Sequence, residues 1–473
     1  MVQRQRVVVI GGGFAGFTVV RTLSRIAKGA IEIVLINPTD YFLYLPLLPE
    51  VASGILDPRK VAVSLAGDHP GVRHLLATVD TVDVEARRVK CTDTEGNHRE
   101  LGYDRLVVAV GSVNKLLPVP GVAEYAHGFR SIAEALYLRD HLIRQIELAD
   151  ASDDPEERRA RCTFVVVGAG YTGTEVAAQG QLFTRDLRGR RPGLRGQPVR
   201  WILADVAPRI LPELDERLSR TAHRTLSERG VEIRTGTSVA EATAEGVKLS
   251  DGEFVATRSL IWCVGVRPDP MVESLGLPTE KGRLLVDEYL KVPGHPEIFA
   301  CGDAAAVPDL TRPGEYAAMT AQHASRQGKR AARNIAASYG HGELQPYKHH
   351  DLGFVVDLGG TGAAANPLGV PLSGMLAKAV TRGYHLLAIP RNRARIAGSW
   401  LLDLVVPRQT VQLNLVRGPA VPLTQATPEH PHGPGEDPPK TNASRKAGAS
   451  PKAGASKAGA SSKAGNSSKA DDS

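Results

Sequence analysis

Two segments of the chain share one pattern of hydrophobic positions. In the first, an apolar run at residues 7–10 predicts a buried strand, followed by a helix over about 13–27 and a strand over 31–36. In the second, the apolar run 164–167 precedes a helix and a further strand over 199–205. Apolar strands that alternate with helices are typical of a parallel sheet covered on both faces. The pattern therefore predicts an α/β fold with two Rossmann-like domains.

The rest of the chain divides by turn signals and composition. An apolar strand over 104–112 ends in a glycine turn, and Asp251-Gly252 indicates a β-hairpin. From about residue 283 the chain is expected to return to the first domain. The last residues are rich in Lys, Ala, Gly and Ser, a composition that cannot form a core. We therefore expect a first dinucleotide-binding domain in two parts (1–115 and 283–346), a second such domain with its linker (116–282), a C-terminal helical module (347–422) and a tail (423–473).

Each predicted strand–helix unit carries a glycine-rich turn of the form G-x-G-x-x-G. Such a turn lets backbone N–H groups reach a pyrophosphate at the positive N-terminus of a helix. One turn of this kind is weak evidence, because glycine turns also serve plain packing. Two of them, each with its own strand and helix, indicate two dinucleotide sites in one chain. The glycines are Gly11, Gly13 and Gly16 in the first unit and Gly168, Gly170 and Gly173 in the second.

The residue that ends the second strand of a Rossmann unit contacts the adenosine ribose. A carboxylate at this position accepts hydrogen bonds from the ribose hydroxyls and repels a 2′-phosphate. In the second unit this residue is Asp205, which favours NADH over NADPH, although Arg209 follows four residues later. In the first unit the corresponding residue is Asn37, an amide that can bond hydroxyls without the charge.

A third motif indicates which dinucleotide the first domain binds. The strand at 297–301 ends in Gly302-Asp303, and another strand ends in Gly111-Ser112. Together these two strand ends resemble the signature of the flavoproteins with two dinucleotide domains, in which the Asp meets the ribityl and pyrophosphate region of FAD. The resemblance implies FAD in the first domain and NADH in the second.

Composition excludes several classes of function. The four cysteines lie far apart, so neither a metal site, nor a disulfide framework, nor a redox-active cysteine pair is expected. A net charge of +7 over 473 residues gives no reason to expect a nucleic-acid partner. No run reaches 18 apolar residues, and the first strand follows the N-terminus directly. We therefore expect neither a transmembrane helix nor a signal peptide, and a protein made and kept in the cytoplasm.

Two further segments resemble the type II NADH dehydrogenases, which are single-subunit NADH:quinone oxidoreductases. Residues 321–328 match the family motif A-Q-x-A-x-Q-Q-G except at Arg326. The family loop Y-H-L-F-Q-P-L-L reads Y-F-L-Y-L-P-L-L at residues 41–48, with Leu45 in place of Gln. The Glu of the family's G-G-x-x-G-V-E motif falls on Glu175, and its W-T-A-G-V turn falls on residues 262–266, which include Gly265. The resemblance extends from about residue 5 to residue 422.

This resemblance implies electron transfer from NADH through FAD to a membrane quinone, without proton pumping. Glu175 and Gln322 are the implied catalytic residues. Ala321 and Gly265 join the cofactor-binding residues, and the quinone side is implied to include Pro46, Leu47, Gln322 and Gln327. Two alternatives stay open: a soluble NAD(P)H:acceptor flavin reductase, and a redox-sensing flavoprotein without sustained turnover. Glu175 also has an alternative role, as an acidic residue in the first turn of a helix.

The C-terminal module indicates how a water-insoluble quinone is reached. Between residues 372 and 387 apolar residues recur at helical spacing, and the basic turn 391–395 leads into a segment with Trp400 and further leucines. Amphipathic helices flanked by Arg and carrying an interfacial Trp are typical of membrane-surface binding. The same face is also suited to packing on the protein itself or to a homodimer. We expect a peripheral enzyme on the cytoplasmic side of the cell membrane.

Overall fold

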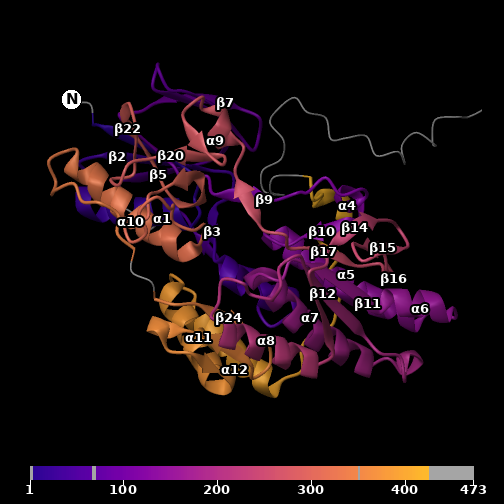
Figure 1. Cartoon of the computed structure of the whole chain (residues 1–473). Coiled ribbons are helices and arrows are strands. Elements are labelled where there is room, and N and C mark those ends of the chain that lie inside the picture. Colours follow the sequence, from indigo (N-terminus) through magenta and orange to yellow (C-terminus); the bar gives the residue numbers. More distant parts are fainter. Residues whose placement is uncertain (1–3, 67–70, 350–351, 425–473) are drawn as a thin grey trace, which may run out of the picture. The chain divides into compact units, whose positions relative to one another are not determined.

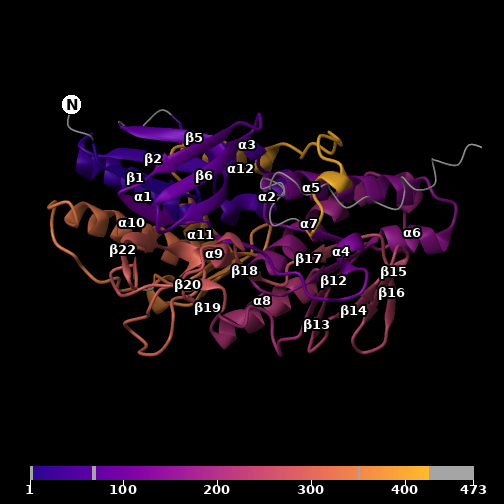
Figure 2. The same ribbon diagram turned by 90° about the horizontal axis from the view of Figure 1, so that it is seen from above.

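The computed structural model describes residues 4–66, 71–349 and 352–424. Its first domain is an eight-stranded sheet with the order β21-β22-β8-β1-β2-β5-β6-β7. Helices α1 (Phe14–Ala27) and α10 (Ala321–Ala337) pack side by side on this domain (Figures 1 and 2). The central strands β22, β8, β1, β2 and β5 are parallel to one another, as the apolar runs predicted, and the outer strands β21 and β6 pair with them antiparallel. The strands are β1 (Arg6–Ile10), β2 (Glu32–Asn37), β5 (Val72–Asp83), β6 (Arg88–Asp93), β7 (His98–Gly102), β8 (Arg105–Val108), β21 (Lys291–Val292) and β22 (His295–Ala300).

The second domain is a five-stranded parallel sheet with the order β10-β17-β11-β12-β13. Helices α5 (Ile132–Asp150), α7 (Tyr171–Gly189) and α8 (Glu216–Glu228) belong to it. A three-stranded antiparallel sheet, β14-β15-β16, contains the hairpin expected at Asp251-Gly252. The α/β fold with two Rossmann-like domains is confirmed. The strands are β10 (Ala126–Gly128), β11 (Thr163–Val167), β12 (Arg200–Asp205), β13 (Val231–Thr235), β14 (Val239–Ala242), β15 (Gly246–Leu249), β16 (Phe254–Ala256) and β17 (Leu260–Trp262).

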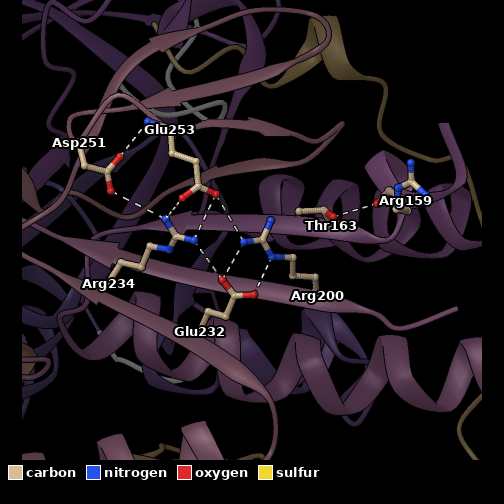
Figure 3. Close-up of polar contacts among 7 residues, drawn as sticks. All are labelled: Arg159, Thr163, Arg200, Glu232, Arg234, Asp251 and Glu253. Atoms are coloured by element: carbon tan, nitrogen blue, oxygen red, sulfur yellow. Dashed lines mark hydrogen bonds and ion pairs between the residues drawn. The ribbon is translucent and has the colours of Figure 1, made fainter. Parts of the chain in front are cut away.

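An ion-pair network joins these two sheets (Figure 3). Arg200 Nε of β12 lies 2.6 Å from a carboxylate oxygen of Glu232 on β13. Arg234, also on β13, pairs with Glu253 in the turn between β15 and β16. These side chains are partly exposed, so each pair contributes at most about 1 kcal/mol. The network lies at the start of β12, whereas Asp205 ends that strand. The network therefore joins the two sheets at the opposite end of β12 from the expected nucleotide site.

The C-terminal module contains a small antiparallel sheet of β24 (Val355–Asp357), β25 (Ala363–Ala365) and β26 (Leu372–Ser373). Two helices follow, α11 (Gly374–Ala388) and α12 (Arg393–Val405). No helix within the described residues is both long and apolar enough to cross a membrane. Of the expected tail 423–473, only Leu423 and Thr424 are described, and Leu423 is buried. The remainder of that tail lies outside the described residues.

Helix α11 reverses the usual distribution of side chains in a globular protein. Its buried face carries Lys378, Thr381 and His385, besides Ala377, whereas Met375 and Leu387 are 74% and 75% exposed. In α12, Ile396, Ser399 and Trp400 are buried, and the leucines of the other face are exposed. The module therefore packs on the protein through a mixed face of polar and apolar residues and presents an apolar face outward.

Candidate active site

The first glycine turn connects β1 to α1 and has room for a ligand at one position only. A Cβ at Gly16 would lie 1.8 Å from the carbonyl oxygen of Gly11, and one at Gly11 would lie 2.4 Å from that of Ala109. At Gly13 a Cβ would meet no atom within 4 Å. Gly11 and Gly16 are therefore required for close packing, while Gly13 faces open space at the N-terminus of α1. This cradle fits the pyrophosphate of a dinucleotide.

The second glycine turn, between β11 and α7, repeats this geometry. A Cβ at Gly173 would lie 1.8 Å from the carbonyl oxygen of Gly168, and one at Gly168, whose φ is +99°, would lie 2.2 Å from that of Cys263. At Gly170 a Cβ would meet nothing within 4 Å, and Gly265 also faces open space. Because the two turns have the same close and open positions, they fit the same class of ligand.

Asn37 and Asp205 occupy equivalent places at the ends of β2 and β12. The Oδ1 atom of Asn37 accepts a 2.7 Å hydrogen bond from the N–H of Gly12, and Asp205 accepts one from the N–H of Ala169. Each side chain thus fixes its own glycine turn from the position that meets a ribose. Arg209 donates to the carbonyl oxygens of Pro212 at 2.6 Å and Leu214 at 2.8 Å. Its guanidinium is therefore already bonded within its own loop, and the Asp205 carboxylate is the charge that stands at the end of β12.

The Gly302-Asp303 turn lies between β22 and α10. Ser112 donates a hydrogen bond to the Asp303 carboxylate, and Arg130 donates to the Ser112 hydroxyl at 2.8 Å. The N–H of Gly302 donates to Oε1 of Gln327 at 2.8 Å. Gln327, expected on the quinone side, is buried beneath this turn and uses its amide oxygen to hold it. Gly111, which follows β8, has a φ of +80°, and a Cβ added there would meet no atom within 4 Å. The space beside Gly111 is therefore also open.

Helix α10 begins at the predicted motif. The Thr320 hydroxyl accepts from the His323 N–H as the N-cap, so Ala321 is the first helical residue. The Gln322 amide bonds to the segment that leads into β24: its Nε2 donates to the Gly353 carbonyl and its Oε1 accepts from the Leu352 N–H, both at 3.3 Å. Gln322 thus joins the first domain to the C-terminal module.

The segment expected on the quinone side forms β3 (Tyr41–Leu43), a 3-10 turn (Leu45–Leu47) and α2 (Leu48–Ala52). Pro46 is half-buried, whereas Leu47 is buried in the core. Tyr44 bonds to Nδ1 of His385 on α11 at 3.1 Å. Burial lowers the pKa of His385 to about 4, so this histidine is neutral at pH 7.

Glu175 lies where three parts of the chain meet. It is on α7, its Oε1 accepts a 2.9 Å hydrogen bond from the N–H of Asp357 on β24, and Glu50 on α2 is a neighbouring charge. Burial raises the pKa of Glu175 to about 8, against the hydrogen bond from Asp357. The carboxyl group is therefore largely protonated at pH 7. Because α7 begins at Tyr171, Glu175 is not in its first turn, and the alternative interpretation from the helix dipole is wrong on this point.

The sequence analysis did not predict three charged residues of this cluster, Glu50, Asp357 and Lys378. Lys378 of α11 pairs with the Asp357 carboxylate, and Trp400 of α12 donates to Glu50. Burial and the charge of Asp357 raise the pKa of Glu50 to about 7. The available signal was the polar side of α11, which carries Lys378 away from the apolar stripe. Their partners are 21 to 350 positions away in sequence, so only the fold identifies the cluster.

The chain is similar to known proteins in sequence and in fold. The family model described as pyridine nucleotide-disulphide oxidoreductase matches residues 5–328. The type II NADH:quinone oxidoreductase Ndh of Mycobacterium tuberculosis is 31% identical over 425 residues, which cover 86% of this chain and 89% of that protein. The demethylphylloquinone reductase NdbB of Synechocystis is 32% identical over 410 residues, 84% of this chain and 96% of that protein.

Among solved structures, the fold is similar to that of NDH2 from Plasmodium falciparum in complex with NADH. The TM-score is 0.80 with 18% identity, and the match covers 86% of this chain and all of that one. At this identity the likeness concerns the fold alone.

Proposed function

The chain belongs to the pyridine nucleotide-disulphide oxidoreductase family and, within it, to the type II NADH dehydrogenases, and we propose that it transfers electrons from NADH through FAD to a quinone. The observation that carries the proposal is the repeated glycine cradle, one in each domain, with open space at Gly13 and at Gly170. The bound flavin supplies the two-electron chemistry. The four cysteines are single thiols far apart in sequence, and burial raises the pKa of Cys162 to about 11. They support no disulfide step.

The residues of the chain have separate tasks in this proposal. Gly11, Gly13, Gly16 and Asn37 hold the FAD pyrophosphate and ribose end, and Asp303, fixed by Ser112 and Arg130, holds its ribityl region. The NADH site is formed by Gly168, Gly170, Gly173, Asp205 and Gly265. The protonated carboxyl of Glu175 holds a proton for the reduced acceptor, since a quinone that takes two electrons also takes two protons. Gln322 and Pro46 lie towards the quinone, and Gln327 supports the Gly302 turn from below.

The activity is tested with purified protein and a panel of acceptors. We expect a yellow protein with non-covalent FAD that oxidises NADH continuously when a quinone is supplied. A soluble NAD(P)H:acceptor reductase would prefer water-soluble acceptors to quinones. A redox-sensing flavoprotein would be reduced once by NADH and then stop. A colourless protein that binds neither FAD nor FMN would overturn the whole scheme.

Replacing Asp205 by alanine is expected to raise the KM for NADH about 10- to 100-fold. The bound nucleotide would lose its ribose hydrogen bonds to the carboxylate, worth roughly 1.5–3 kcal/mol for a charged acceptor. Discrimination against NADPH should narrow, because the carboxylate no longer repels the 2′-phosphate. Steady-state kinetics with both nucleotides measure this, and Asp186→Ala on α7, which lies outside the predicted site, is the control. A wild-type enzyme that prefers NADPH would show that the assignment is reversed.

The same proposal places the enzyme on a membrane surface, from the cytoplasmic side, through α11 and α12. What supports it is the outward apolar face of these helices, whose large side chains are 58% to 75% exposed. Soluble proteins seldom expose so many large apolar side chains together. This face, called here the apolar face, consists of Met375, Leu376, Leu387, Leu401, Leu402, Leu404 and Val405. A homodimer that covers it is the competing arrangement.

Leu401→Gln with Leu404→Gln is expected to lower vesicle binding about tenfold or more, since each leucine loses part of roughly 1.5–3 kcal/mol of burial. Deleting the module would be less informative, because it also removes Lys378 and Trp400 from the charged cluster. Phe254→Gln with Leu310→Gln, at exposed apolar sites elsewhere, is the matched control. Flotation measures binding, and reduction of FAD by NADH should be unchanged. Unaltered binding together with loss of a dimer in sedimentation would contradict the membrane assignment.

A further inference from the structure

A surface cavity of about 300 Å³ lies beside the apolar face, outside the cofactor sites. It is lined by Asp57, Arg59, Lys60 and Arg395. Three of these residues belong to the N-terminal part of the chain, around α3 (Pro58–Val61), and Arg395 belongs to the first turn of α12 (Figure 2). The cavity thus forms only when the C-terminal module docks on the first domain.

The walls of the cavity are fixed to each other by hydrogen bonds. The amide of Asn392 donates to the carbonyl oxygens of Lys60 at 2.9 Å and Ala62 at 3.0 Å, the end of α3. The ammonium group of Lys60 donates to the hydroxyl of Ser399, which is buried on α12. The backbone around the cavity is therefore held in place before any ligand binds, which lowers the entropic cost of binding.

The cavity is strongly cationic. Its single acid, Asp57, is already bonded by the Arg59 guanidinium at 2.9 and 3.0 Å, which lowers the pKa of that carboxyl and keeps it ionised. Three cations against one carboxylate leave an excess of positive charge. Further cations belong to the same region: Arg391 and Arg393 lie in the same turn as Arg395. Burial, and then the charges of Arg25, Arg393 and Arg391, lower the pKa of Arg21 on α1.

No acidic residue occurs in the sequence between Asp357 and Asp403. The basic turn 391–395 and the part of α12 before Asp403 therefore carry basic residues and no acidic one. An anion is the ligand that this charge attracts, and guanidinium groups match phosphate oxygens in geometry as well as in charge.

The apolar face decides which anion fits. Leu401 follows Arg395 by six residues on α12, a rise of about 9 Å along the helix. A free phosphate ion would use the cations and leave these leucines in water. A phospholipid uses both, because its phosphate reaches the cavity while its chains lie on the leucines, with the Arg and Lys stems spanning the boundary. The charges and the apolar side chains are thus explained by one ligand.

We infer that this cavity binds the phosphate of an anionic phospholipid and so orients the enzyme on the bilayer. The inference rests on the proposed membrane contact of α11 and α12 and adds the chemical class of the lipid. Juxtaposed cations contribute about a factor of five each to binding at an anionic surface, because each is worth about 1 kcal/mol.

The test compares the full-length holoenzyme with Arg59→Gln/Arg395→Gln on two kinds of vesicle. One is phosphatidylcholine alone, and the other contains phosphatidylcholine and phosphatidylglycerol in a ratio of three to one. We expect the variant to bind the phosphatidylglycerol vesicles about 10- to 30-fold more weakly, and to bind phosphatidylcholine as the wild type does. Arg59→Lys/Arg395→Lys should retain most of the binding, and FAD content and flavin reduction by NADH should not change in either variant.

The matched control is Arg88→Gln/Arg99→Gln, which removes the same charge from exposed positions on β6 and β7. In Figure 1, β7 lies at the top of the view and α12 at the bottom. If this control lowers binding to phosphatidylglycerol vesicles as much as the cavity variant, only net charge matters and the cavity assignment is overturned. If Leu401→Gln/Leu404→Gln binds both kinds of vesicle as the wild type does, the proposed membrane contact of α11 and α12 is itself wrong. Displacement of the wild type by inorganic phosphate at constant ionic strength would assign the cavity to a free anion instead.

Discussion

Glu175→Gln is expected to lower kcat with quinone about a hundredfold, the lower end of the range for removal of a general acid. The substituted amide keeps the shape of the neutral carboxyl but has no proton to transfer. In the wild type, a pKa near 8 means that the group is protonated below about pH 8 and ionised above it. Activity that needs this proton should therefore fall as the pH rises through 8.

Two readouts separate this role from a merely structural one. In Glu175→Gln the fall in kcat near pH 8 should disappear, and the rapid reduction of bound FAD by NADH should remain, when followed by stopped flow from pH 6 to pH 9. Glu216→Gln is the chemically matched control, since Glu216 forms an exposed ion pair with Arg220 on α8. Its kcat should differ from that of the wild type by less than twofold. A variant with normal kcat and an unchanged pH profile would leave Glu175 as a packing residue that only accepts a bond from Asp357.

Gly170→Ala is expected to raise the KM for NADH about 10- to 100-fold while the protein folds normally. A Cβ at this position meets no protein atom within 4 Å, and the φ of −71° suits any residue. The methyl group would instead occupy the cradle and displace the pyrophosphate from backbone N–H groups, whose bonds to a charged acceptor are worth about 1.5–3 kcal/mol each.

The neighbouring glycines provide the contrast. Gly173→Ala places a Cβ 1.8 Å from the Gly168 carbonyl oxygen, so it should disrupt the turn and lower the melting temperature. Gly189→Ala, at the far end of the same helix, also meets open space and should change nothing. The measurements are KM, thermal melting and FAD absorbance. A normal KM in Gly170→Ala would show that this turn does not hold NADH, and loss of FAD would assign the flavin to the second domain.

The comparisons confirm the expected family, and the structure explains several of its motif residues in physical terms. Gly328 is required because a Cβ there would lie 2.3 Å from the carbonyl oxygen of Ala15, so it lets α10 pack closely on α1. Gln327 holds the Gly302 turn from a buried position, a role that a motif match could not reveal. Two neighbouring residues of one motif therefore have different structural roles, helix packing at Gly328 and support of a turn at Gln327.

Local patterns in the sequence determined the two sheets, their glycine turns and the residues that end β2 and β12. This was possible because strand, turn and ribose contact lie within about 40 residues of each other and follow from periodicity and backbone geometry. The C-terminal helices were also recognisable from spacing alone. Their sequence favoured membrane-surface binding but was also suited to packing on the protein, and only the structure shows that the apolar face is exposed.

Only the tertiary structure decided the environment of the charges. Burial raises the pKa of Glu175, which accepts a hydrogen bond from Asp357, and burial together with the charge of Asp357 raises the pKa of Glu50 to about 7. Glu50 and Asp357 lie 125 and 182 positions from Glu175 in the sequence. The cavity at Arg59 and Arg395 likewise exists only where two distant segments dock. Electrostatic energies depend on distance and desolvation in space, quantities that a linear pattern does not contain.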